Sequence, residues 1–377
     1  MASADRARHI GILIYPGAQM SAVLGLTDLF VTADRLACGR LGATKPLLRV
    51  SHLAPAPDGE AVETVLDMHP DGEGRPDVII LPPSLGDPPL ASGPPSGAGL
   101  GSLLDWLRER HADGTILASV CAGAFLLAET GLLAGRTATT HWIYAEPFAA
   151  RFPAVHVDAG KLLIDDGDIV TAGGLMAWTD LGLHLLDRLL DSAAMFETAR
   201  LLVVDPPGRE QRYYTAFSPR LDHGDGPILK VQRWLRENGT RAITVGDMAA
   251  RAGLEERTFL RRFSAATGLR PIEYCQHLRI GKARELLENT NTAIDRIGWD
   301  VGYGDPASFR KLFLKLTGLT PGAYRRRFGA FHGDTRDGDR ACPRSPVSGG
   351  ADAAAISPEA GRGPYSRRPI VNRDAAA

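Results

Sequence analysis

A motif that occurs twice near the C-terminus constrains this 377-residue chain more than any other feature. The first copy runs from Gly253 to Tyr274, and the second from Gly302 to Tyr324. From Phe259 and Phe309 onward, equivalent residues are 50 positions apart, and such a period indicates duplicated structural units. Each copy contains a short helix, a glycine turn and an amphipathic helix that carries Arg or Lys, which is the pattern of a helix-turn-helix. Two such units in tandem predict a protein that binds DNA.

Charge separates this segment from the rest of the chain. The formal net charge is -1, but residues 228–328 contain 19 Lys/Arg against 10 Asp/Glu, which is a local charge of +9. The remaining residues therefore sum to -10. A basic segment joined to an acidic one is typical of a nucleic-acid-binding domain attached to a domain with another task.

Helical periodicity divides the second helix of each unit into a buried and an outward face. Phe259 and Phe263, and likewise Phe309 and Phe313, are four residues apart and are predicted to face the core. Arg can bind guanine edges with two hydrogen bonds, and Arg or Lys can bind phosphate. For one helix alone a merely solvated charged face is the alternative, but the duplication and the local basicity favour DNA contact. The predicted DNA-binding residues are Arg257, Thr258, Leu260, Arg261, Arg262, Ala307, Ser308, Arg310 and Lys311.

The two copies are unequal. The first offers three Arg residues around the apolar Leu260, whereas the second offers the smaller Ala307 and Ser308. The first helix is therefore expected to dominate base readout, and the second to contribute more phosphate contact. A long helix predicted over residues 272–287 would place both in successive major grooves, about 34 Å apart.

Residues 228–328 resemble the DNA-binding domain of the AraC/XylS family. Gly302-Tyr303, Ser308-Phe309, Gly318, Pro321 and Tyr324-Arg325 fall at that family's signature positions. Two residues depart from its pattern, because Leu260 replaces a frequent polar base-contacting residue and Gly298 replaces a usual Ala. The first change is expected to alter sequence preference, and the second costs up to about 1 kcal/mol of helix propensity.

Residues 8–204 alternate short β-rich runs with longer helical patterns. This alternation predicts a doubly wound, flavodoxin-like α/β domain with a mostly parallel sheet. The nearly all-apolar run at 77–81 is predicted to be a central strand. Such sheets bind ligands at the carboxyl ends of their strands. Strands are predicted at 9–15, 47–53, 77–81, 115–120 and 168–171, and helices at 23–36, 100–110, 122–130 and 175–190.

Composition marks the other segments. Residues 205–227 are predicted to link the α/β domain to an all-α domain over 228–328. The run at 83–101 is a predicted surface loop, and residues 332–377 are a predicted disordered tail. Neither a membrane span nor a signal peptide is recognisable, so a cytoplasmic protein is expected. The four scattered Cys residues and the His residues lack metal-ligand spacing, so no metal and no cofactor are expected.

Cys121 is the most chemically suggestive residue of the α/β half. It lies where an apolar strand meets a helix, and small residues such as Ala122 and Gly123 surround it. This is typical of a nucleophile elbow, a tight turn that presents a side chain at a helix N-terminus. The helix dipole is expected to lower the thiol pKa and to favour an anion there. His141 is the candidate base.

The same half resembles the ThiJ/PfpI superfamily, relatives of the class I glutamine amidotransferases. The Cys-Ala-Gly elbow, residues 131–141 and residues 168–173 carry the resemblance. Fusion of such a domain to an AraC-type module is typical of the GlxA-like transcriptional regulators, and residues 200–211 resemble the stretch that follows their sensor domain. The resemblance implies a regulator whose α/β domain senses a small metabolite.

Three roles stay open for the α/β domain. Enzymatic relatives place an acidic residue after the first strand, but residues 16–27 contain no Asp or Glu. Ala122 stands where proteolytic relatives have His, and Pro82-Pro83-Ser84 replaces an expected glycine pair. An effector pocket is therefore favoured, with a cysteine-dependent amidase or hydratase-like enzyme, or a purely structural dimerisation domain, as the alternatives. The predicted pocket residues are Cys121, Ala122, Gly123, His141 and Trp142.

The expected partners follow from these assignments. They are double-stranded DNA, a small-molecule effector, and a second copy of the chain bound through the α/β domain. RNA polymerase is a further candidate partner, and no membrane is expected.

Overall fold

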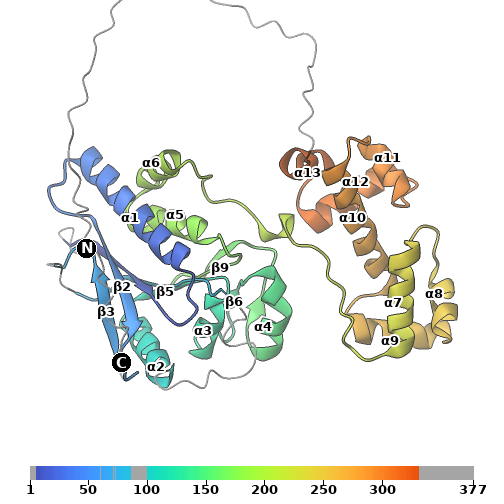
Figure 1. Cartoon of the computed structure of the whole chain (residues 1–377), viewed down its shortest axis with the longest axis horizontal. Coiled ribbons are helices and arrows are strands. Elements are labelled where there is room, and N and C mark those ends of the chain that lie inside the picture. Colours follow the sequence, from blue (N-terminus) through green and yellow to red (C-terminus); the bar gives the residue numbers. More distant parts are fainter. Residues whose placement is uncertain (1–5, 60, 71, 73, 86–99, 331–377) are drawn as a thin grey trace, which may run out of the picture. The chain divides into compact units, whose positions relative to one another are not determined.

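The computed structural model describes residues 6–59, 61–70, 72, 74–85 and 100–330 (Figure 1). The predicted disordered tail at 332–377 lies outside the described residues, as does most of the predicted loop at 83–101.

A seven-stranded, mostly parallel sheet organises the N-terminal half. β1 pairs in parallel with β2 and β4, and β5 pairs in parallel with β4 and β9. Only the two edge pairings, of β3 with β2 and of β8 with β9, are antiparallel within this sheet of the described chain. The predicted doubly wound α/β class is confirmed. The strand order is β3 (Val62–Asp67), β2 (Leu48–Pro55), β1 (Arg8–Leu13), β4 (Val78–Leu81), β5 (Ile116–Val120), β9 (Ile169–Ala172) and β8 (Leu163–Asp165).

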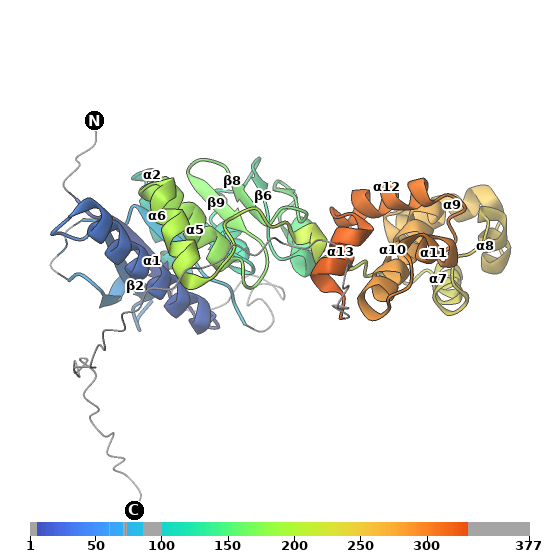
Figure 2. The ribbon, with the colours of Figure 1, turned by 90° about the horizontal axis from the view of Figure 1, so that it is seen from above.

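Strand β4 shows why the sheet is covered on both faces. All four of its residues are buried, as predicted for a central strand. Because successive side chains of a strand point to opposite faces, Val78 and Ile80 join one apolar core while Ile79 and Leu81 join the other. The first core includes residues of α1 (Met20–Leu41), α5 (Trp178–Leu189) and α6 (Ser192–Leu202), and the second includes residues of α2 (Leu100–Ala112), α3 (Gly123–Glu129) and α4 (Ala145–Arg151). Figure 1 shows the two groups of helices on opposite sides of the sheet, and Figure 2 shows the side of α1, α5 and α6.

Several short elements are absent from the sequence prediction. Strand β3 is mostly exposed, so it lacks the apolar run by which the other strands were recognised. Helices α5 and α6 are separated by two residues, Leu190 and the N-cap Asp191, whose carboxylate accepts from Ala194 N. The other unpredicted elements are β6 (Thr137–Ala138), β7 (His156–Val157), β8, α4 and the 3-10 turn η1 (Trp142–Tyr144).

The C-terminal half is helical, as predicted, and contains two separate apolar cores. Phe259, Phe263 and Tyr274 lie fully buried in the first core, and Phe309 and Phe313 in the second. The predicted connecting helix is α10, which contributes residues to both cores. The domain limits at 204, 228 and 328 stay predictions. The helices are α7 (Gly226–Asn238), α8 (Val245–Ala252), α9 (Glu256–Thr267), α10 (Pro271–Asn289), α11 (Ile294–Asp300), α12 (Pro306–Thr317) and α13 (Pro321–Phe328).

Candidate nucleic-acid interface and ligand site

The first helix-turn-helix is formed by α8 and α9. Thr244 begins α8 with a capping box, in which its hydroxyl accepts from Asp247 N at 3.2 Å and Asp247 accepts from Thr244 N at 2.9 Å. On α9 the buried stripe is Phe259, Phe263 and Ala266, as the phenylalanine spacing predicts. This stripe lies in the same apolar core as Met248 and Ala249 of α8, so the two helices share one buried interior.

The outward face of α9 carries three exposed predicted residues. Arg257 and Arg261 are exposed, and neither forms an ion pair with any described residue. Leu260 lies between them and is 38% exposed, while Thr258 is half-buried. Two uncommitted guanidinium groups beside an apolar side chain form a surface that can contact base edges and a thymine methyl group.

Arg262 is placed differently from its neighbours. Its guanidinium donates twice to the Asp225 carboxylate, at 2.9 and 2.7 Å. Asp225 is the N-cap of α7, and this paired guanidinium holds the pKa of the carboxyl below its usual value. Arg262 therefore joins α9 to the start of α7, and two of its N–H donors are already engaged.

The second helix-turn-helix is formed by α11 and α12. Asp305 is the N-cap of α12 and accepts from Ala307 N at 3.1 Å and from Ser308 N at 2.8 Å. The Ser308 hydroxyl also donates to this carboxylate, at 2.7 Å. Ala307 and Ser308 are exposed, but part of the hydrogen-bonding capacity of Ser308 is already used for capping.

The two cations predicted on α12 differ in their contacts. Arg310 donates to Asp295 of α11 at 2.5 Å. Lys311 is exposed and has no ion pair within the described residues. Arg310 is therefore already paired within the helical half, whereas the ammonium group of Lys311 can bind phosphate.

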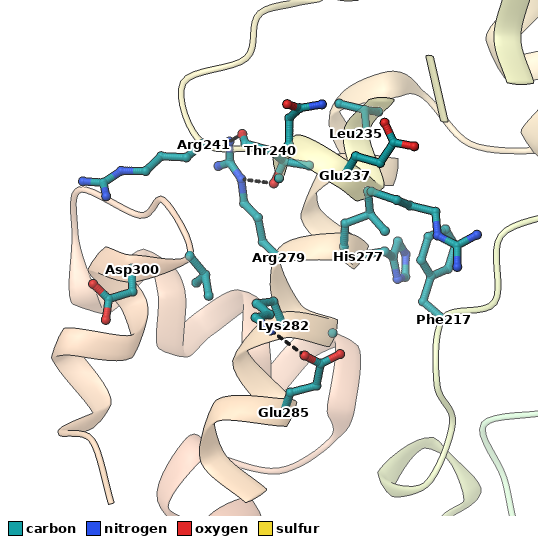
Figure 3. Close-up of a pocket in the computed structure, with 16 residues that line it drawn as sticks. Phe217, Leu235, Glu237, Thr240, Arg241, His277, Arg279, Lys282, Glu285 and Asp300 are labelled. Carbon is teal, nitrogen blue, oxygen red and sulfur yellow. Dashed lines mark hydrogen bonds and ion pairs between the residues drawn. The ribbon is translucent and has the colours of Figure 1, made fainter. Parts of the chain in front are cut away.

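Arg279 of α10 connects the two units (Figure 3). It donates to Thr240 O at 2.6 Å and to Thr240 Oγ1 at 3.1 Å, in the turn between α7 and α8. It also donates to Gly302 O at 3.3 Å, in the turn of the second unit, and lies 5.6 Å from the ring centre of Tyr303. Sequence periodicity gave no reason to single out this residue. The neighbouring cavity of about 680 Å³ is lined by residues that include Arg236, Arg241, His277, Arg279, Lys282 and Asp300.

Cys121 adopts the predicted elbow. It follows β5, its φ is 54°, and its N–H donates to Ala172 O at 2.7 Å, which extends the β5–β9 pairing into the turn. Gly123 is required for this close approach, because a Cβ there would lie 2.4 Å from Leu81 O. The backbone is that of a nucleophile elbow, with the strain of a left-handed non-glycine residue.

The expected lowering of the Cys121 pKa is wrong. Burial raises the pKa of this thiol to about 11, and the hydrogen bond from the Ala122 backbone offsets only part of this effect. The side chain is 2% exposed and belongs to an apolar core. Desolvation disfavours the charged thiolate more than the short helix α3 stabilises it, so the thiol is protonated at neutral pH.

His141 and Trp142 lie at the start of η1. Nδ1 of His141 accepts from Ile143 N at 3.2 Å, and burial lowers the pKa of the imidazole. Among the described residues no hydrogen bond joins this ring to the Cys121 thiol. The rings of His141 and Trp142 are 5.5 Å apart. The elbow and the candidate base are therefore both present without the contact that base catalysis requires.

A hydrogen-bond network lies behind the elbow. The Thr140 hydroxyl donates to Cys121 O at 2.8 Å. Gln211, in the 3-10 turn η2 (Gln211–Tyr213), donates to Thr140 O at 2.8 Å and is 2% exposed. In the sequence, Gln211 belongs to the stretch at 200–211 that resembles the GlxA-like regulators, but no periodicity there predicts that its side chain is buried.

Two further classes of site have no support in the described chain. No group of three or more His, Cys, Asp or Glu residues is arranged to hold a metal ion among the residues the structure describes. Within the same residues, none of the helices has the length and apolar content needed to span a membrane.

Comparison with known proteins matches each half separately. Residues 93–188 match the DJ-1/PfpI family, and residues 248–327 match a helix-turn-helix domain family. The chain is 28% identical over 333 residues to the HTH-type transcriptional regulator GlxA of Rhizobium meliloti (strain 1021), covering 86% of this chain and 97% of that protein.

Two further similarities concern single halves. The chain is 30% identical over 164 residues to isonitrile hydratase of Pseudomonas putida, covering 40% of this chain and 70% of that protein. A crystal structure of the DNA-binding domain of AdpA with target DNA is 32% identical, with a TM-score of 0.26, and covers 27% of this chain and 92% of that chain. From the two family matches and the similarity to GlxA, the chain is a DNA-binding transcriptional regulator that joins a DJ-1/PfpI-family domain to an AraC-type helix-turn-helix domain.

Proposed function

We propose that the α/β domain senses a small-molecule effector and that its occupancy alters DNA binding by the helical domain. The observation that carries this proposal is the Cys121 elbow, which keeps a strained turn while its thiol stays buried and protonated. A protonated thiol is a poor nucleophile, whereas a shaped turn can line a pocket. The proposed pocket residues are Cys121, Ala122, Gly123, His141 and Trp142.

The test uses the full-length protein and a set of metabolites. Each metabolite that raises the Tm of the protein is then added to fluorescence-anisotropy titrations of DNA. We expect it to change the affinity of the protein for DNA, and DNA should change the affinity for the metabolite by the same factor. DNA affinity itself is expected to fall as salt rises. If every metabolite that binds the protein leaves DNA affinity unchanged, the sensing proposal is wrong.

A second candidate function is a cysteine-dependent hydratase-like activity, which the similarity to isonitrile hydratase supports. We expect no such turnover, because the thiol is protonated and, among the described residues, His141 makes no hydrogen bond with it. The assay is addition of water to an isonitrile by the parent protein and by Cys121→Ala. Turnover by the parent that disappears in the variant would establish the enzyme instead.

Self-association through the α/β domain is part of the proposal. Leu24 and Val31 lie seven residues apart on α1 and are 52% and 37% exposed, so they share one face of the helix. Replacing Leu24 with Asp is expected to shift a dimer toward monomer in analytical ultracentrifugation, and an unchanged mass would exclude this face. RNA polymerase is a further proposed partner, and the cytoplasm is the proposed location.

A further inference from the structure

The Gln211 side chain occupies a built site in the α/β domain. Its Nε2 donates to Thr140 O at 2.8 Å, to Lys161 O at 3.0 Å and to Thr139 Oγ1 at 3.1 Å. Its Oε1 accepts from Trp142 N at 3.1 Å. These partners form what we call the amide recess, a site with three acceptors for an NH2 group and one donor for a carbonyl oxygen.

The recess exists because residue 173 has no side chain. A Cβ at Gly173 would lie 1.9 Å from Nε2 of Gln211 and 2.6 Å from Thr140 O. Atoms that close cannot coexist with a methyl group, so glycine leaves the space that the amide fills. The walls come from the α/β domain, whereas the group inside comes from the segment that follows it.

The amide recess is connected to the elbow by one residue. The peptide of Thr140 supplies an acceptor to Gln211, while the hydroxyl of the same residue donates to Cys121 O. A change in what fills the recess therefore acts on the backbone that positions Cys121.

The same segment is fixed on both sides of Gln211. Arg209 forms an ion pair with Asp180, a side chain that is only 3% exposed. Tyr213 O accepts from Arg284 of α10 at 2.8 Å, and Thr215 O accepts from the same guanidinium. Arg284 also donates to the hydroxyl of Tyr324, in the core of the second helix-turn-helix, at 2.7 Å. Gln211 thus lies on a continuous chain of contacts that reaches the DNA-binding half.

We propose that Gln211 is an internal ligand of the α/β domain and that the effector carries a primary carboxamide that displaces it from the amide recess. This inference rests on the proposed sensing function and names the chemistry of its ligand. One carbonyl oxygen and one NH2 group match the one donor and three acceptors of the recess. Displacement of Gln211 releases residues 209–215 and so changes the contacts of Tyr213 and Thr215 with Arg284 of α10. Because a tethered group has an effective concentration of the order of millimolar, a small competitor needs a comparable concentration.

The experiment uses the full-length protein with propionamide, which reproduces the Gln211 side-chain amide. N,N-dimethylpropionamide is the matched control ligand, because it has no N–H to donate. Trypsin cleavage after Arg209 and Arg212, assigned by mass spectrometry, reports release of the segment, since proteolysis follows the population of the open form. Gln211→Ala empties the recess, and Gln276→Ala on α10 is the matched control substitution.

Gln211→Ala is expected to be cleaved at these sites about tenfold faster than the parent, as loss of its hydrogen bonds implies. Propionamide is expected to raise the Tm of Gln211→Ala and to speed cleavage of the parent, while the dimethylated amide does neither. Cleavage of Gln276→Ala should match the parent. Equal effects of the two amides, or equal cleavage of Gln211→Ala and the parent, would overturn the inference. Should Gln211→Ala not fold, the comparison of both amides on the parent decides alone.

The two proposals fail in different ways. If metabolites that bind the parent leave its DNA affinity unchanged, the sensing function fails, whatever propionamide does. If a metabolite changes DNA affinity equally in the parent and in Gln211→Ala, and propionamide is inert, only the internal-ligand inference fails.

Discussion

The two helix-turn-helix units have nearly the same core and different exposed charges. Thr267 Oγ1 donates to Phe263 O at 2.8 Å and to Leu269 O at 3.1 Å. In the second unit Thr317 Oγ1 makes the equivalent bonds to Phe313 O and Leu319 O at the same two distances. The duplicated interior has therefore kept its hydrogen bonds in both copies.

The outward faces differ in which cations are free. On α9, Arg257 and Arg261 lack ion pairs within the described chain, whereas Arg262 is bound to Asp225. On α12, Arg310 is bound to Asp295, and Lys311 has no ion pair within the described residues. A count of basic residues overstates what each helix offers, because acids of neighbouring segments already bind one Arg of each helix. The difference supports unequal roles, with base readout concentrated on α9.

The largest effect is expected at α9. Arg257→Ala and Arg261→Ala are each expected to weaken binding to a selected operator by about 1–3 kcal/mol and to relax its sequence preference, as for Arg bound to guanine. The measurement is anisotropy with the operator and with single-base variants of it. If both substitutions weaken all sequences equally, α9 contacts phosphate rather than bases.

Arg279→Ala tests whether the two units act as a rigid pair. Losing its bonds to Thr240 and Gly302 is expected to cost about 1–2 kcal/mol of operator affinity. It should also reduce discrimination against DNA with one base pair inserted between the two contacted grooves. Lys282→Ala is the control, because the one ion pair of that side chain within the described residues is the exposed pair with Glu285. Unchanged discrimination would show that the units are positioned by their cores alone.

Lys311→Ala tests the second helix. It is expected to weaken binding by about 1 kcal/mol or less on all sequences and to reduce the slope of log affinity against log salt by about 0.9. Titrations at several salt concentrations measure both. A loss confined to one base pair would instead assign base readout to α12.

Arg262→Ala should leave operator affinity unchanged to within about twofold, and it should lower Tm. The pairing lowers the folded-state pKa of Asp225. Its contribution to the free energy of unfolding is therefore present above the unfolded pKa near 3.8 and is lost as pH falls through the folded pKa. Denaturant titrations should show that the variant loses less stability than the parent on acidification from pH 7. A large loss of DNA affinity would show that Arg262 exchanges Asp225 for phosphate.

Cys121→Ala is expected to have the smallest effect on DNA binding, because the thiol lies in the other half of the chain. Alkylation of Cys121 by iodoacetamide should stay slower than that of the less buried Cys38 at pH 8, since the Cys121 thiol has a pKa of about 11. Mass spectrometry of the labelled peptides measures this. Fast labelling of Cys121 at pH 8 would restore its candidacy as a nucleophile.

Periodicity and local turns were predictable because they depend on residues close in sequence. The elbow at Cys121, the central strand at 77–81 and the buried phenylalanines all follow from short patterns. The ion pairs of Arg262 and Arg310 do not, since their acids lie 37 and 15 residues away. The thiol pKa was predicted in the wrong direction because a helix N-terminus is visible in a sequence, whereas the burial that opposes it is a tertiary property.

Gly298 and Gln211 also have tertiary contacts that the sequence does not predict. Gly298 was interpreted only as a cost in helix propensity, but a Cβ there would lie 3.1 Å from the ring of Phe309, so an Ala would crowd that ring. Gln211 bonds to Thr139 and Trp142 of one segment and to Lys161 of another, which precede it by 72, 69 and 50 residues. No spacing rule brings such segments together.

The strained turn at Cys121 has a consequence for how this domain can change. Its left-handed backbone is held by the hydrogen bond from Cys121 N to Ala172 O and by the tight packing at Gly123, and neither depends on the thiol. The geometry would therefore persist through replacement of the reactive groups around it. We expect such a domain to move between receptor and catalyst over evolutionary time, or in directed evolution, by few side-chain substitutions, with an acid near residues 16–27 as the natural starting point.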